Sequence, residues 1–534
     1  MKREDMLCRV SGVLLKCADL IFAALFAFVV VRVTWNTQSM IPGSIGRYIT
    51  MCFLWIILVG CCVFLWRKLL RGKDYKRRLL LVAFALQAIY VWAVYSQVDS
   101  DAYVITYIAY HFAQGDLAAL EGFWREYLAV YTNNIPATAV LTAVFSVWMP
   151  DTLEQTWLLL SVIAAVLSDI ALLFIFKLVK TVVNETAAIV AMVLAIASIS
   201  LSEPSTILYS DIMALWTTPA ALYAITRGRM GDKQYIGAAG VLLAVGSWIK
   251  PQSLIVTIAV GIILILEWMG EPGKEQRKLV GKRGALLVGC FLIVLLGLSA
   301  ITNAAVNLIG KEYVGQNEMP AIHFVAMGLN PETNGAYSED DVVDMKSTVG
   351  HEAKMDLCRS KISARLKDMG LLGLLRHIDG KLVHGAGNGT FTSGREWRGI
   401  LLNDSLQAVR IQNWTVVYET KFQEFTSVWV QCGYLFMLVL SLHSAIYALS
   451  DKRRETEPTQ WFLTNVCRIA MIGTVLMLVV LERNLRYMYA ILPCMVFLTA
   501  YDLKKISDEL RQKRVPGNGS LRVGTAPHPV RKNR

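Results

Sequence analysis

Long apolar stretches, separated by short charged segments, recur along the whole chain. Stretches close to the length of a membrane span lie at residues 13–34, 48–66, 79–96, 156–176, 183–203, 207–226, 234–249, 252–268, 284–308, 426–449, 460–481 and 486–502. A transmembrane helix needs about 20 predominantly apolar residues, so this pattern predicts about 12 spans. The sequence therefore predicts an all-α polytopic membrane protein.

The composition agrees with this pattern. Of the 534 residues, 55% are hydrophobic and 18% are charged, whereas roughly a quarter of a soluble domain is charged. The formal net charge of +12 raises the question of a nucleic-acid partner. Most Lys and Arg, however, fall in loops on one side of the predicted spans, above all Arg67–Arg78, Lys274–Arg283 and the tail after Tyr501. This bias predicts a cell-membrane protein with both termini cytoplasmic, lipid as the partner of the basic residues, and no nucleic acid.

The spans divide the chain into five segments. We expect two amino-terminal spans and a basic cytoplasmic loop (1–78), a membrane core with an acidic first external loop at 97–155 (79–309), and an external α-rich subdomain (310–425). Carboxy-terminal spans (426–503) and a basic, disordered cytoplasmic tail (504–534) complete the chain. The apolar segment Ile135–Met149 is too short to span, so we expect an interfacial helix anchored by Trp148. In the subdomain, Glu352–Val383 has helical periodicity.

Polar residues gather at the outer ends of the predicted spans. They are Asp99, Asp101, Asn133, Asn134, Glu203, Tyr209, Asp211, Lys250, Glu482, Arg483, Arg486 and Tyr487. An ionisable group close to hydrocarbon costs about 2.5–3.5 kcal/mol on insertion scales, so their repetition at one depth needs a reason. Carboxylates can act as a general base on a hydroxyl, and Lys or Arg can stabilise a phosphate leaving group. The set fits group transfer from a lipid phosphate.

Each of these residues also has an ordinary explanation. A lone acidic residue in an external loop is usually just solvated. Lys250 and Arg486 could be interfacial anchors, and Asn134 could cap the helix that follows it. Glu203 precedes Pro204 and could simply end a helix. The coincidence of several such positions on one side is the stronger argument.

Several of these positions lie in stretches that resemble a known family. The stretches are DAYVITYIAYHFAQG from Asp101, YTNNIPATAVL from Tyr131, the pair Ser210 and Asp211, WIKP from Trp248, and ERNLRYMYAILP from Glu482. Together they look like the GT-C fold of polyprenyl-phosphate-sugar glycosyltransferases. Within it, the chain is most similar to the bacterial protein O-mannosyltransferase and aminoarabinose-transferase type. The similarity extends over about residues 79–503.

The resemblance implies a function at the outer face of the membrane. A sugar on a polyprenyl phosphate would be transferred, with inversion, to a hydroxyl of an acceptor protein or cell-envelope glycopolymer. Asp101 or Asp99 would be the catalytic base, and Lys250, Arg483 or Arg486 would bind the phosphate. Asp211 and Glu203 would orient a substrate or, with the first loop, hold a divalent ion such as Mg²⁺ or Mn²⁺. Because Lys and Arg are available for the phosphate, no metal or other cofactor is required.

Two other functions remain open at this point. A transporter or flippase of lipid-linked glycans would need ionisable residues in mid-span, and apart from Asp19 and Arg468 the predicted spans contain few. A glycopolymer polymerase or ligase would use a pyrophosphate-linked donor. Zinc-binding, Walker and dinucleotide fingerprints are missing from the sequence, which argues against an ATP-driven pump or a nicotinamide enzyme.

Overall fold

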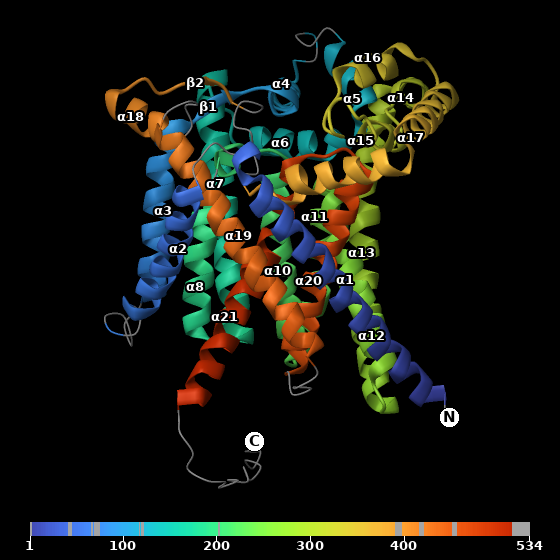
Figure 1. Cartoon of the computed structure of the whole chain (residues 1–534). Coiled ribbons are helices and arrows are strands. Elements are labelled where there is room, and N and C mark those ends of the chain that lie inside the picture. Colours follow the sequence, from blue (N-terminus) through green and yellow to red (C-terminus); the bar gives the residue numbers. More distant parts are fainter. Residues whose placement is uncertain are drawn as a thin grey trace, which may run out of the picture.

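The computed structural model describes residues 3–40, 45–65, 68, 75–116, 118, 122–200, 203–389, 398–415, 421–450 and 457–514. Long helices run roughly side by side, and most of the shorter elements lie across one end of them (Figure 1). Helix α1 (Arg3–Met40) begins, and helix α21 (Leu492–Arg514) ends, at the opposite end. The two ends of the described chain are therefore on the same side of the bundle.

Long helices form the bundle together with several shorter apolar ones. They are α1, α2 (Ile45–Leu65), α3 (Tyr75–Val94), α7 (Leu153–Val182), α8 (Glu185–Ala195), α10 (Thr217–Arg229), α11 (Gln234–Ile249), α12 (Leu254–Gly270), α13 (Lys274–Ile309), α19 (Lys421–Leu449), α20 (Pro458–Val480) and α21. Helix α11 packs on α10 and α13, α1 packs on α19 and α12, and α7 packs on α8 and α10. Sequence-distant helices thus share one apolar core.

Six helices of the described chain are long and apolar enough to cross a membrane. They lie at Asp5–Trp35, Leu153–Val182, Pro251–Gly270, Lys274–Ile309, Ser427–Leu449 and Pro458–Val480. A bent pair, Phe123–Val130 and Thr132–Val147, would make a seventh if it counted as one span. Each of the six coincides with a predicted span, so the multi-pass all-α architecture is confirmed.

The predicted number of about twelve spans is not shown. Gly46–Cys61, Leu80–Val94, Glu185–Ile199 and Gln234–Ile249 are apolar helices, but they are shorter than a span. The stretch predicted at 207–226 is divided into α9 (Ser210–Leu215) and α10. The last predicted span is a 3₁₀ turn (Leu485–Ile491) followed by α21.

The first loop and the predicted subdomain lie at the end of the bundle away from the start of α1 (Figure 1). Their elements are α4 (Ser100–Gln114), α5 (Phe123–Val130), α6 (Ile135–Val147), α14 (Lys311–Asn317), α15 (Ile322–Gly328), α16 (Glu339–Ser347), α17 (His351–Lys381) and α18 (Leu406–Thr415). Helices α5 and α6 meet at 101°. Trp148 is exposed directly after α6, and the interfacial role of this helix stays a prediction. Strand β1 (Ser96–Val98) pairs antiparallel with β2 (Arg398–Leu401), which no sequence pattern predicted.

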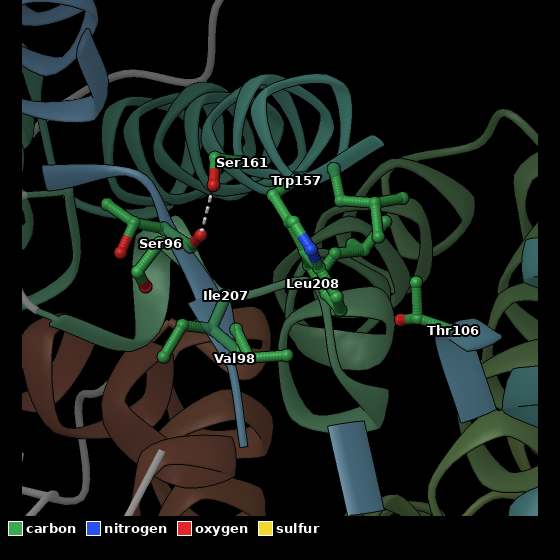
Figure 2. Close-up of a pocket in the computed structure, with 9 residues that line it drawn as sticks. Ser96, Val98, Thr106, Trp157, Ser161, Ile207 and Leu208 are labelled. Atoms are coloured by element: carbon green, nitrogen blue, oxygen red, sulfur yellow. Dashed lines mark hydrogen bonds between the residues drawn. The ribbon is translucent and has the colours of Figure 1, made fainter. Parts of the chain in front are cut away.

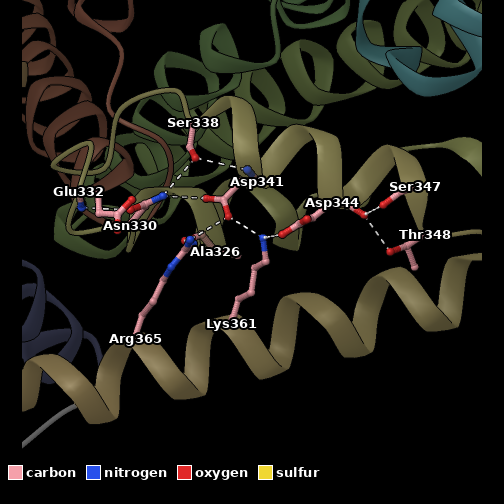
Figure 3. A network of polar contacts seen from close by, with 10 residues as sticks. All are labelled: Ala326, Asn330, Glu332, Ser338, Asp341, Asp344, Ser347, Thr348, Lys361 and Arg365. Atoms are coloured by element: carbon pink, nitrogen blue, oxygen red, sulfur yellow. Dashed lines mark hydrogen bonds and ion pairs between the residues drawn. The ribbon is translucent and has the colours of Figure 1, made fainter.

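A buried carboxylate of α16 joins this helix to α17 and to the turn after α15. Asp341 accepts hydrogen bonds from Lys361 and Arg365 of α17, each at 2.7 Å, and from the Asn330 amide at 3.2 Å (Figure 3). Burial alone would raise the pKa of Asp341, but the hydrogen bonds from Arg365 and Lys361 outweigh it and lower that pKa to about 2. The predicted helix at Glu352–Val383 is confirmed as α17.

Candidate functional site

Most of the predicted site residues meet where α4 and α9 begin and α11 ends, near the loop after α20. The polar side chains come from the start of α4, the turn between α5 and α6, the start of α9, the residue after α11 and residues 482–487. Helix α9 packs on α11 and on the 3₁₀ turn Leu485–Ile491, while α4 packs on α6. Five separate parts of the sequence therefore contribute to one cluster.

A chain of hydrogen bonds begins at Asp101. The hydroxyl of Tyr127 donates to Asp101 Oδ1 at 2.6 Å and accepts from Asn134 Nδ2 at 2.8 Å. The Tyr209 hydroxyl in turn donates to Asn134 Oδ1 at 3.1 Å. Asp101 stands in the first turn of α4, where a negative charge is favoured by the helix dipole. The buried part of this chain, Tyr127 to Tyr209, fixes the carboxylate from one side.

Two cations share a second carboxylate. Lys250 Nζ lies 3.0 Å from Asp211 Oδ1, and Arg486 Nη1 lies 3.3 Å from Asp211 Oδ2. Lys250 also donates to the Ser210 hydroxyl at 3.3 Å. The side chains of Asp211 and Lys250 are almost fully buried, with exposures of 7% and 10%. Among these three side chains, two positive charges thus face one negative charge.

The Tyr209 ring connects the two parts of the cluster. Both Lys250 Nζ and the Arg486 guanidinium lie 5.4 Å from its centroid, while its hydroxyl reaches Asn134. Lys250 also lies 5.8 Å from the ring of Tyr487. Asp101 is near enough to affect the electrostatics of Lys250. Carboxylate and cations therefore belong to one site.

Glu482 adds a second acidic group at this site. It is buried directly after α20, within electrostatic reach of Arg486, Lys250 and Asp101. Burial raises the pKa of Glu482, whereas Arg486 counteracts part of that rise. Tyr337 of the external segment is largely exposed, and partial burial together with the negative charges of Glu339, Asp101 and Glu482 raises its pKa. The external segment thus approaches the site through Tyr337.

Other predicted residues lie apart from this cluster. Asp99 is the exposed N-cap of α4 and accepts from the Ser100 amide at 2.6 Å. Asn133 is exposed, unlike its neighbour Asn134. Arg483 donates to the Asn334 carbonyl at 3.2 Å, which ties it to the external segment rather than to Asp211. The side chain of Glu203 lies outside the described residues.

The loop that carries Glu482 and Arg486 is fixed from the external segment. Lys381 of α17 is fully buried and donates to the carbonyls of Gly328 at 2.7 Å, Val479 at 2.9 Å and Leu481 at 2.7 Å. A Cβ on Gly328 would stand 2.5 Å from the Leu481 carbonyl, so only glycine allows this approach. The end of α20 is therefore packed tightly against α15 and α17.

Sequence reasoning missed Tyr127 and Lys381. Tyr127 is one of several aromatic residues in the first loop, and nothing in its surroundings marks it as the partner of Asp101. Lys381 lies within a periodic helix and reads as a solvated lysine. Only the fold shows that the two side chains hold the carboxylate and the cation loop in place.

The described residues do not fit a metal centre. They contain no group of three or more His, Cys, Asp or Glu side chains close enough to hold an ion. Both oxygens of Asp211 face cations, and Asp101 accepts from Tyr127. An Mg²⁺ or Mn²⁺ ion prefers several free oxygen donors, and these carboxylates do not offer them.

A small cavity is lined by residues that are close in sequence to members of this cluster. It is lined by Ser96, Val98, Thr106, Trp157, Leu160, Ser161, Thr206, Ile207 and Leu208 (Figure 2). Ser161 donates to the Thr206 carbonyl at 2.8 Å, and Thr106 donates to the Ala102 carbonyl at 2.7 Å. These polar side chains are already satisfied, so the cavity is not a better candidate than the cluster.

A family described as "conserved hypothetical integral membrane protein" matches residues 15–507. The chain belongs to this family. Its members are integral membrane proteins, which agrees with the candidate spans. No curated protein matches the sequence of this family member.

One solved structure similar to this integral membrane protein is the archaeal oligosaccharyltransferase AglB from Archaeoglobus fulgidus, in complex with an inhibitory peptide and a dolichol-phosphate. The TM-score is 0.36 and the sequence identity is 11%, over 84% of this chain and 53% of that chain. This chain thus spans about half the length of that structure.

Proposed function

We propose that this integral membrane protein is an inverting glycosyltransferase of GT-C type, similar to the mannosyl- and aminoarabinosyltransferases. It would transfer a sugar from a polyprenyl phosphate to an acceptor hydroxyl at the outer face of the cell membrane. In this proposal the four shorter apolar helices, α10 and α21 also cross the bilayer, giving twelve spans with both termini in the cytoplasm. The observation that carries the proposal is that the Tyr209 ring joins the hydrogen-bonded chain from Asp101 to the cation pair Lys250 and Arg486.

The carboxylate end of the cluster suits a general base. Asp101 is only partly buried, and one of its oxygens accepts from Tyr127 at 2.6 Å. Its other oxygen would accept the proton of the acceptor hydroxyl as that oxygen attacks the anomeric carbon. The new bond joins the acceptor oxygen to the anomeric carbon, and the bond from that carbon to the phosphate oxygen breaks. A single displacement inverts the configuration at that carbon.

The cation end suits the leaving phosphate. Lys250 and Arg486 together carry two positive charges, both lie against Asp211, and Glu482 is within electrostatic reach of both. A polyprenyl phosphate released at this place would be attracted by the two cations in a largely buried setting, where such attraction is stronger than in water. Tyr487 and Glu482 would contact the sugar or the acceptor. The lipid chain would lie along the apolar outer surface of neighbouring helices.

The test is transfer by the purified protein, with a matched pair of variants. The protein is incubated with a panel of polyprenyl-phosphate sugars, and mass spectrometry detects any acceptor that gains a hexose or pentose. Asp101→Asn should lower the transfer rate by about 10²–10⁴-fold, the usual range for loss of a general base. Asp99→Asn should retain it, because Asp99 is exposed and asparagine is an equally good helix cap. Equal rates for Asp101→Asn and wild type would refute the proposal.

The same preparation separates the alternatives. A polymerase or ligase would accept pyrophosphate-linked donors in place of monophosphates. A flippase would move labelled lipid-linked sugar across proteoliposomes without any covalent product. Arg468 donates to Asp19 at 2.8 Å and to the Ser444 hydroxyl at 2.8 Å. A transport path would need ionisable side chains that are available to a substrate, and these two are paired with each other.

A further inference from the structure

The last part of α17 exposes leucine side chains and buries ionisable ones. Leu371, Leu372 and Leu375 are exposed by 73%, 70% and 54%, whereas His377 and Lys381 of the same helix are buried. On a helix that faces water, leucines turn inward and lysine turns outward. The reverse arrangement is what a helix shows where its outer face meets lipid.

A glycine separates this part from the rest of α17. Gly370 has φ of 57° and ψ of −174°, inside a run of helical residues. Such a positive φ strains residues that carry a Cβ, so the change of direction needs glycine here. Before Gly370, α17 packs on the buried Asp341 network through Lys361 and Arg365. After it, the helix runs across the end of the long helices (Figure 1).

Two anchors fix the level of this segment. Asp379 pairs with Arg32, whose Nε donates to Asp379 Oδ1 at 2.7 Å. Arg32 belongs to the last turn of the candidate span Asp5–Trp35. Lys381 bonds the carbonyls of Val479 and Leu481, where the candidate span Pro458–Val480 ends. The segment is therefore fixed next to the ends of these two candidate spans, where the hydrocarbon layer of the membrane ends.

We propose that residues 371–376 of α17 are seated in the bilayer interface, on the membrane face that carries the candidate site, with the three leucines among the lipid acyl chains. The exposed leucines lie at i, i+1 and i+4, which places them on one side of the helix. Arg376 is exposed beside them and can extend its guanidinium to the headgroups. Lys381, at the end of the same helix, bonds the backbone directly before the loop that carries Glu482 and Arg486.

The proposal is independent of the proposed function, because it concerns lipid contact and not transfer. The wild-type protein is placed in bilayers with a phospholipid that carries a diazirine in its acyl chain, and labelled peptides are identified after illumination. We expect label on the peptide that contains Leu371, Leu372 and Leu375, and on Ile293 of α13, which is 72% exposed in a candidate span. Helix α16 lies farther from the long helices (Figure 1). Its exposed Val343 should therefore stay unlabelled.

A triple variant, Leu371→Gln, Leu372→Gln and Leu375→Gln, tests the role of the leucines. Label on the segment should fall by about tenfold or more, since three apolar side chains no longer favour the lipid, while label at Ile293 stays the same. Unchanged label at Ile293 also shows that the variant is still folded in the bilayer. Label at Ile293 without label on wild-type residues 371–376 would overturn the proposal. So would a photo-adduct of this segment with another protein in native membranes, obtained with benzoylphenylalanine at Leu372.

Discussion

The shared carboxylate of Asp211 allows a prediction that does not depend on the proposed function. Asp211→Asn removes the one negative charge that lies against both Lys250 and Arg486. At an effective dielectric constant of about 20, a pair at such distances attracts by about 5 kcal/mol, so the gross loss is about 10 kcal/mol. Part of it is regained, because an amide is easier to bury than a carboxylate. Removal of one partner from a buried ion pair usually leaves a net loss of about 3–5 kcal/mol.

The complementary variant should be far milder. Lys250→Met leaves Asp211 paired with Arg486 and removes a buried amine, so we expect a loss of about 1 kcal/mol. In the double variant only Arg486 loses its carboxylate partner, whereas in Asp211→Asn both Arg486 and Lys250 lose it. The double variant should therefore be more stable than Asp211→Asn alone, so the losses of the two single variants should not add.

The measurement is the free energy of unfolding of the purified protein, from SDS titration in mixed micelles followed by far-UV circular dichroism. Asp211→Asn, Lys250→Met and the double variant are compared in the same detergent and at the same pH. A loss below about 0.5 kcal/mol for Asp211→Asn, or equal losses for the two single variants, would show that the cations do not depend on this carboxylate.

Two further predictions concern Tyr127 and His323. Tyr127→Phe removes the hydrogen bond to Asp101, and bonds to charged groups contribute about 1.5–3 kcal/mol, so sugar transfer should fall by about 10–100-fold with an unchanged KM for the donor. Burial lowers the pKa of His323 from 6.5 to about 4, and its Nε2 has no hydrogen-bond partner among the described residues. Because the unfolded chain takes up the proton first, stability should fall by about 3 kcal/mol as pH drops from 6.5 to 4. Hydrogen exchange of α15 would detect this loss, and His323→Phe should remove most of it.

The spans that sequence predicted best form apolar helices of 20 or more residues with no proline beyond the first turn. Two of the predicted stretches were interrupted by proline. The ring of Pro219 excludes a hydrogen bond to the Leu215 carbonyl, and α9 ends at Leu215. Pro493 likewise stands in the first turn of α21, where it fits a helix start and not a helix interior. Hydropathy windows average over such residues and so miss the breaks.

For the site, the sequence could locate charges but not their partners. Arg483 and Arg486 are close in sequence and seemed equivalent as phosphate ligands. Arg483 precedes the 3₁₀ turn Leu485–Ile491 and contacts the Asn334 carbonyl, whereas Arg486 lies inside this turn and contacts Asp211. Which of two nearby arginines faces a cluster depends on the packing of α15 and α17 against the end of α20, a long-range feature that no local pattern contains.

The hydrogen bonds of the chain that begins at Asp101 all have one direction, toward this carboxylate. The Tyr127 hydroxyl has a single proton, and its oxygen accepts from the Asn134 amide. That proton is therefore free to point at Asp101, and the amide oxygen of Asn134 is left to accept from Tyr209. Every member of the chain donates toward Asp101, so the carboxylate is held as an acceptor, the form that a base needs. Asn134→Asp would remove the donor to Tyr127 and add a charge, and should disturb Asp101 more than Asn133→Asp at the exposed neighbouring position.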